Sequence, residues 1–112
     1  MTITESNWWD VLSQDTIDKV FSEVAFPGWA FEHAAITETS LMMYLAPELV
    51  REDKISDEMG AEPAAYVKYP IVEGMVPASG VLAPAVSSSA EKGKLMTDEA
   101  ISAFIEIADK NF

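Results

Sequence analysis

A proline-interrupted stretch in the second half of the chain limits most strongly what this sequence can fold into. Residues 70–89 contain three prolines and two glycines. Proline lacks the backbone N–H that a central strand donates, so the stretch is too rich in proline to be one. An unstructured connection of this length is uncommon within a compact domain. We therefore expect an extended arm that lies over another part of a larger protein.

Two short helices are predicted before this arm. The first begins at Ser13 or Asp15 and is broken by Pro27-Gly28, and its apolar face has the helical spacing of Ile17, Val20, Phe21 and Val24. The second covers residues 41–46, with Thr39-Ser40 as its cap. Glu38 precedes that cap and is expected to interact favourably with the helix dipole.

A longer helix is predicted after the arm. Ser88 and Glu91 fit the S-x-x-E capping box, the helix extends to Lys110, and its apolar stripe consists of Ile101, Phe104, Ile105 and Ala108. Signals for strands are few and weak, at residues 1–9 and in the alternation of residues 66–69. Residues 51–64 are charged and predict a surface loop. This inventory indicates an incomplete α/β unit.

One small domain covering residues 1–112 is expected, because a chain of 112 residues can bury a single core. Apolar residues make up 49% of the sequence, so the chain is globular rather than disordered. The formal net charge of −12 predicts a solubilising surface and argues against nucleic-acid binding, because an acidic chain repels phosphates.

Cysteine is absent from the sequence, which excludes disulfides and thiolate metal sites and fits a cytoplasmic location. No apolar run approaches the length of about 20 residues that a membrane span requires. Residues 1–5 have neither the basic nor the apolar segment of a signal peptide. We therefore expect a cytoplasmic protein that does not enter the membrane.

Residues that can carry chemistry gather just after the Pro27-Gly28 break. Glu32 and His33 are adjacent, and His33 is the single histidine. A histidine can take and return a proton near neutral pH, and a neighbouring carboxylate can position its ring. Trp29 follows the break, where a movable loop could cover a ligand. The same residues also fit a structural histidine and core tryptophans, because large aromatic residues dominate core burial.

The pattern of residues 28–42, G-W-A-F-E-H-A-A-I-T-E-T-S-L-M, resembles a signature of the creatininase family, approximately G-W-x-x-E-H-A/G-G-x-x-E-T-S-x-M. Residues 46–50 (A-P-E-L-V) resemble the family's next element, and residues 89–93 (S-A-E-K-G) resemble the start of its last helix. Trp9 lies 20 residues before Trp29, similar to two tryptophans that line the family's pocket. The chain thus resembles the carboxy-terminal half of a creatininase-like amidohydrolase.

This resemblance implies roles for four residues. His33 matches the histidine proposed to shuttle a proton to the leaving nitrogen of a cyclic amide, and Glu32 matches the carboxylate that supports the pocket or the histidine. Trp29 matches the tryptophan of a loop that closes over the substrate, and Trp9 matches a second aromatic wall. The implied fold is α/β: a partial creatininase-like three-layer architecture with a parallel sheet, of which this is the helix-rich half.

One position departs from the signature, because the family usually has glycine where Ala35 stands. A methyl group there predicts either crowding of a close backbone approach or a backbone angle that alanine disfavours.

The family also implies a divalent metal, zinc or manganese, bound through Glu-x-His, Asp and His-x-Glu motifs. These ligands are absent from the chain, whose single histidine is assigned to proton transfer. We therefore expect a fragment or split subunit of a metal-dependent amidohydrolase that acts on a cyclic amide or a related C–N bond. A metal-binding half or subunit would complete it, in a homo- or hetero-oligomer. The alternative is a non-catalytic interaction or ligand-binding module derived from that fold.

Overall fold

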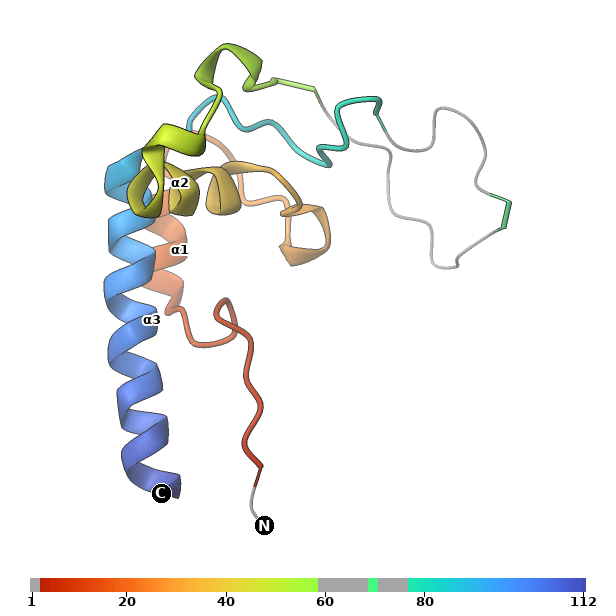
Figure 1. The fold of residues 1–112 in the computed structure, drawn as a ribbon. Coiled ribbons are helices and arrows are strands. Elements are labelled where there is room, and N and C mark those ends of the chain that lie inside the picture. Colours follow the sequence, from red (N-terminus) through yellow and green to blue (C-terminus); the bar gives the residue numbers. More distant parts are fainter. Residues whose placement is uncertain (1–2, 59–68, 71–76) are drawn as a thin grey trace.

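The computed structural model describes residues 3–58, 69–70 and 77–112. Their helices are α1 (Gln14–Val20), α2 (Ile36–Leu45) and α3 (Ala90–Asn111), with the short 3-10 turns η1 (Trp29–Phe31), η2 (Pro47–Leu49) and η3 (Glu52–Lys54). Helix α2 crosses the amino-terminal part of α3, α1 lies beside α3, and the carboxy-terminal half of α3 extends past both (Figure 1).

The expected parallel sheet is wrong for this chain, because the described residues form helices, turns and irregular segments and no β-strand. The described part of the arm makes isolated backbone bonds rather than a ladder: Leu82 N–H donates to His33 O (3.2 Å) and Ala85 N–H donates to Ser56 O (2.9 Å). A strand requires a regular series of such bonds to one neighbour. The alternation predicted at residues 66–68 lies outside the described residues.

The arm packs on this chain itself, at least along the residues described. Val81, Ala83 and Ala85 are buried. The backbone of the same segment is bonded to His33 through Leu82 and to Ser56 through Ala85. The prediction that this segment is not a central strand agrees with the structure for residues 81–85. The surface that these residues pack on belongs to the same chain.

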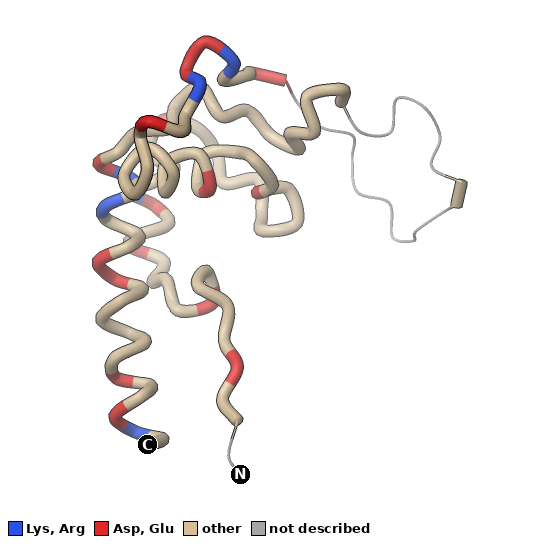
Figure 2. Tube along the Cα trace, viewed as in Figure 1, with Lys and Arg blue, Asp and Glu red and all other residues tan. Residues whose placement is uncertain are grey.

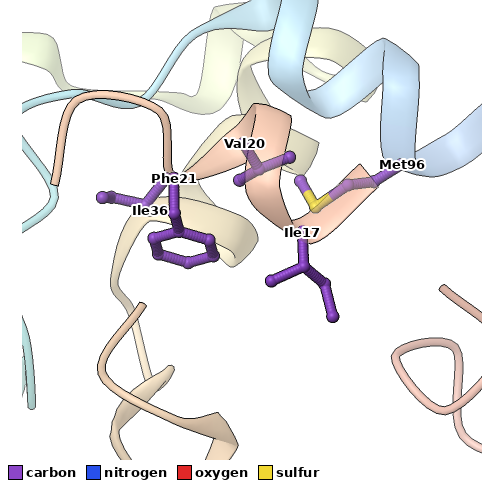
Figure 3. Close-up of a cluster of buried hydrophobic side chains, with 5 residues drawn as sticks. All are labelled: Ile17, Val20, Phe21, Ile36 and Met96. Carbon is purple, nitrogen blue, oxygen red and sulfur yellow. The ribbon is translucent and has the colours of Figure 1, made fainter. Parts of the chain in front are cut away.

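Helix α1 supplies the centre of the core. Ser13 is its cap, because the Ser13 hydroxyl accepts the N–H of Thr16 at 3.3 Å. The buried cluster joins residues of all three helices: Ile17, Val20, Phe21, Ile36 and Met96 (Figure 3). Val24, predicted to continue the apolar face, is exposed, because α1 ends at Val20 and Phe26 folds back onto Phe21, with ring centroids 4.7 Å apart.

Helices α2 and α3 cross at Gly93. A Cβ atom at this position would lie 2.0 Å from the carbonyl oxygen of Ser40. The hydroxyl of Ser40 also accepts the backbone N–H of Ser89 at 3.1 Å, just before α3 begins. The glycine of the S-A-E-K-G segment is thus required by the close approach of two helix backbones.

The cap of α3 is Ser89 rather than the predicted Ser88. The Ser89 hydroxyl accepts the N–H of Lys92 at 3.2 Å, whereas the Ser88 hydroxyl donates to Ala85 O at 2.7 Å. The predicted apolar stripe is largely exposed, with Ile101 at 54% and Ile105 at 56%. In the described chain, this part of α3 therefore has an uncovered apolar face.

Acidic residues are spread along the chain from the amino-terminal segment to α3 rather than gathered at one place (Figure 2). This distribution fits a solvated acidic surface. Within the described ranges, no helix combines the length and the apolar character that crossing a bilayer requires.

Candidate functional site

The site is built on the turn that leads into α2, and Glu32 lies at its start. The Glu32 side chain is buried, and its Oε2 accepts both the backbone N–H of Thr37 (2.9 Å) and the Thr37 hydroxyl (2.6 Å). Burial raises the pKa of the Glu32 carboxyl, although the two Thr37 hydrogen bonds act to lower it. Glu32 therefore caps the helix from five positions upstream of Thr37, and its bonded oxygen serves Thr37 rather than His33.

This contact explains why α2 begins at Ile36 rather than at the predicted Leu41. Ala35 is the N-cap and has no side-chain oxygen, so a more distant side chain must satisfy an N–H of the first turn. Glu32 does this for Thr37. Sequence reasoning looked for a Ser or Thr cap and so chose Thr39-Ser40, which lie inside the helix.

Glu38 reaches back across the same turn. Its Oε2 accepts the backbone N–H of Ala34 at 2.6 Å and lies 3.9 Å from His33 Nδ1. Glu38 is thus a carboxylate that faces the histidine, a role that the sequence reading missed by treating it only as a helix-start charge. A Glu at the third helical position is one part of the capping-box pattern, in which this side chain bonds back to a backbone N–H at the start of the helix. With the helix start at Ile36, that pattern is the sequence signal for Glu38.

His33 is held by its backbone while its side chain stays accessible. The His33 carbonyl accepts the N–H of Leu82 at 3.2 Å, and the imidazole is 68% exposed. Such a residue can be reached by another molecule without a change in the main chain. The His33 ring therefore lies at the surface of the described chain rather than in its core.

The backbone angle disfavoured by alanine falls one residue earlier than predicted. Ala35 has an ordinary φ of −93° and is fully buried. Ala34 has a φ of +53°, in the left-handed region that few non-glycine residues adopt. The Ala34 N–H bonded to Glu38 and the Ala34 carbonyl near the Thr39 hydroxyl (3.4 Å) support this conformation.

The tryptophans form one cluster. The rings of Trp9 and Trp29 lie 6.4 Å apart between centroids, and Trp8 meets both edge-on at 5.7 and 5.9 Å. Phe26 contacts Trp29 at 5.1 Å and links the cluster to the core. All three tryptophans are partly buried, so the cluster serves the core on one side and offers aromatic surface on the other.

A broad groove of about 750 Å³ runs along α2 between these features. Trp8 lines it from the aromatic cluster, and Ala34 and Glu38 line it from the histidine turn, while Leu41, Met42 and Leu45 supply apolar wall. The residues that line the groove are neighbours of His33, Trp9 and Trp29 rather than those three residues themselves.

Metal ligands are not assembled here. Among the residues that the structure describes, there is no group of three or more His, Cys, Asp or Glu side chains that could hold a metal ion. The whole sequence has one histidine and no cysteine. The donor set of residues 3–58, 69–70 and 77–112 therefore does not fit a divalent metal centre.

Fold and site together define a helical unit that presents an accessible histidine and an aromatic cluster, without an assembled metal centre in its described part. The sequence model of the family described as "Creatininase: Creatinine amidohydrolase" matches residues 4–108. The chain belongs to the creatininase family. It is 30% identical over 106 residues to the creatinine amidohydrolase of Pseudomonas putida, covering 95% of this chain and 41% of that protein.

Solved structures agree with this assignment. A creatinine amidohydrolase crystal structure is matched with a TM-score of 0.88 and 31% identity, over 96% of this chain and 41% of that one. A mutant creatininase complexed with creatine is matched with a TM-score of 0.86 and 33% identity, over 94% of this chain and 41% of that one. The chain thus spans about two fifths of the length of these relatives.

Other matched structures bear on metals and tryptophans. One is of a manganese creatininase and another is of a mutant of the Zn-Zn type, so divalent metals occur in the family. Three more carry a replaced tryptophan, at two positions that lie 20 residues apart. Trp9 and Trp29 have the same separation.

Proposed function

We propose that this chain forms the proton-transfer and aromatic side of an amidohydrolase pocket that acts on creatinine or a related cyclic amide. A second segment, on the same or another polypeptide, would supply the metal ligands that the described residues do not assemble. Family membership and the superposition on creatininases support the reaction class. The observation that carries the residue assignment is the accessible His33 imidazole on a turn that is bonded on both sides.

His33 is the proposed proton donor to the leaving nitrogen. Opening a cyclic amide breaks the C–N bond, and the departing nitrogen needs a proton that a histidine can deliver near neutral pH. The exposed ring allows this contact, and the fixed backbone keeps the ring's attachment point in place. Glu32 acts indirectly in this proposal, because its carboxylate shapes the turn through Thr37.

Trp9 and Trp29 are the proposed aromatic walls for the ring of the substrate. Their support is the shared cluster and the spacing of the two tryptophans replaced in the matched creatininases. A flat, uncharged ring is held well against aromatic faces.

The proposal also requires a covering polypeptide, and the chain has surfaces that suit one. Leu45 and Leu49 beside the groove are 60% and 68% exposed, and Ile101 and Ile105 of α3 are about equally uncovered. Large apolar side chains thus meet water both beside the groove and on α3, as they do at surfaces that bind another polypeptide. We propose that residues 1–112 act as one unit within a larger homo- or hetero-oligomeric assembly.

Reconstitution tests the function directly. The chain is mixed with the metal-binding portion of a creatininase, and creatinine consumption is followed against either component alone. We expect turnover only from the mixture, and we expect His33→Ala to remove it while changing the free energy of unfolding of the isolated chain by no more than about 0.5 kcal/mol, because the ring is exposed. A large loss of stability in His33→Ala would instead assign a structural histidine.

Trp29→Ala tests in the same assay whether Trp29 contacts the substrate or only packs against the core. We expect KM for creatinine to rise several-fold while the metal content of the mixture stays at its original level. Equal losses of metal content and of substrate binding would argue against a direct contact between Trp29 and the substrate.

A non-catalytic ligand-binding module is the second candidate, favoured by the tryptophan cluster beside the groove. In that case the isolated chain binds a small cyclic amide, with quenching of tryptophan fluorescence, and the mixture shows no hydrolysis.

A further inference from the structure

We infer that Glu38 is the positioning residue of His33. Its carboxylate fixes the turn that carries the imidazole and also faces the Nδ1 edge of the ring. The inference rests on the proposed function, in which the opposite nitrogen, Nε2, meets the substrate.

Two carboxylates stabilise the backbone on either side of His33. Glu38 Oε2 bonds backward to the N–H of Ala34, and Glu32 Oε2 bonds forward to Thr37. His33 lies between these crossing contacts, and its own carbonyl is held by Leu82. The left-handed Ala34 lies immediately after the histidine, so the Glu38 bond stabilises the backbone conformation directly next to His33.

The effect of Glu38 on the His33 side chain is electrostatic. The distance of 3.9 Å between Glu38 Oε2 and His33 Nδ1 is too long for a direct hydrogen bond but is an ion-pair distance. A negative charge on the Nδ1 side favours the tautomer with its proton on that nitrogen. The lone pair of Nε2 then points away from Glu38, where it can receive and return a proton. Both side chains are exposed, at 68% and 45%, so the bias is moderate.

Nuclear magnetic resonance of the ¹⁵N-labelled full chain tests this inference without turnover. The chain has one histidine, so the ring nitrogens give a single assignable set of signals. With the imidazole neutral, we expect the wild type to have a larger share of the Nδ1–H tautomer than free histidine, in which Nε2–H predominates, because the bias from Glu38 is moderate. Glu38→Gln keeps a carbonyl oxygen for Ala34 but removes the charge, and we expect the ratio of Nδ1–H to Nε2–H to fall by about two- to fivefold.

Glu91→Gln is the matched control, because it removes an exposed carboxylate from the first turn of α3. The tautomer ratio in that variant is expected to equal that of the wild type. A ratio that Glu38→Gln leaves unchanged would overturn the inference, as would a wild-type ratio of Nδ1–H to Nε2–H no higher than that of free histidine. If Glu38→Gln does not fold, the comparison of the wild-type ratio with that of free histidine decides alone.

Kinetics in the reconstituted mixture distinguishes this inference from the proposed function. We expect Glu38→Gln to lower kcat while KM changes little, since the charge acts on the histidine rather than on the substrate. If the wild-type mixture fails to hydrolyse creatinine, the proposed function is wrong, and the tautomer measurement still decides whether Glu38 positions the ring.

Discussion

Replacing Gly93 with alanine tests how closely α2 and α3 approach. The added Cβ would lie 2.0 Å from Ser40 O, 2.6 Å from Ser40 C and 2.9 Å from Tyr44 Cβ. The two nearest atoms belong to the backbone of α2, so rotation of a side chain cannot relieve the contact. Ordinary contact begins near 3.4 Å, and the two helices must therefore separate by roughly 1.4 Å.

Two opposing contributions set the size of the effect. Overpacking of a core position costs about 1–3 kcal/mol, and a clash with backbone belongs at the upper end of that range. Alanine is better than glycine in a helix interior by about 0.8–1.0 kcal/mol. We therefore expect Gly93→Ala to lower the free energy of unfolding by about 2 kcal/mol, with a fall in Tm of roughly 10 °C.

Urea denaturation followed by circular dichroism measures this loss. Ser102→Ala, on an exposed face of the same helix, is the control and should stay within about 0.5 kcal/mol of the wild type. If Gly93→Ala were as stable as the wild type, or more stable, the reasoning would be refuted, because no clash between the backbones of α2 and α3 would then oppose the higher helix propensity of alanine.

Two further predictions concern caps. Ser89→Ala should cost about 1 kcal/mol, because it removes the cap of α3, and Ser88→Ala should cost less; thermal melts of both variants would reverse this order if the sequence-predicted cap were right. Burial raises the pKa of Glu32 above its ordinary 4.5, so the folded chain binds this proton more tightly than the unfolded chain, and its contribution to stability is lost as pH rises through the folded pKa. Glu32→Gln should remove that part of the pH dependence when the free energy of unfolding is measured by urea titration at pH values rising from 4.5. A difference between wild type and variant that stays constant with pH would contradict this expectation.

The helices were predictable to the extent that their signals are local. Ser13 and the spacing of Ile17, Val20 and Phe21 identify α1, and the long apolar pattern identifies α3. The sequence-predicted cap of α3 is one residue early because Ser87-Ser88-Ser89 offers three similar hydroxyls. They are distinguished by contacts in the fold: Ser88 donates to Ala85 O, and the backbone N–H of Ser89 is bonded to Ser40. The start of α2 was missed because its cap comes from Glu32, outside the usual capping position.

The sheet was wrong for a different reason. It was inferred from the architecture of a whole family, whereas the chain spans about two fifths of the relatives that it matches. A resemblance in sequence carries over residues and their local geometry. It does not carry over strands whose hydrogen-bonding partners are not in the segment compared.

The two carboxylates around His33 have structural roles, which must be separated from any proposed chemical role when they are tested. Glu32 and Glu38 hold the first turn of α2, where negative charge also interacts favourably with the helix dipole. Truncating either one would loosen the turn and displace His33 together, so lost activity alone could not separate the two effects. Glu→Gln changes keep an acceptor oxygen and remove only the charge. At this turn, charge removal is therefore the informative perturbation, and the single histidine of the chain reports on it directly.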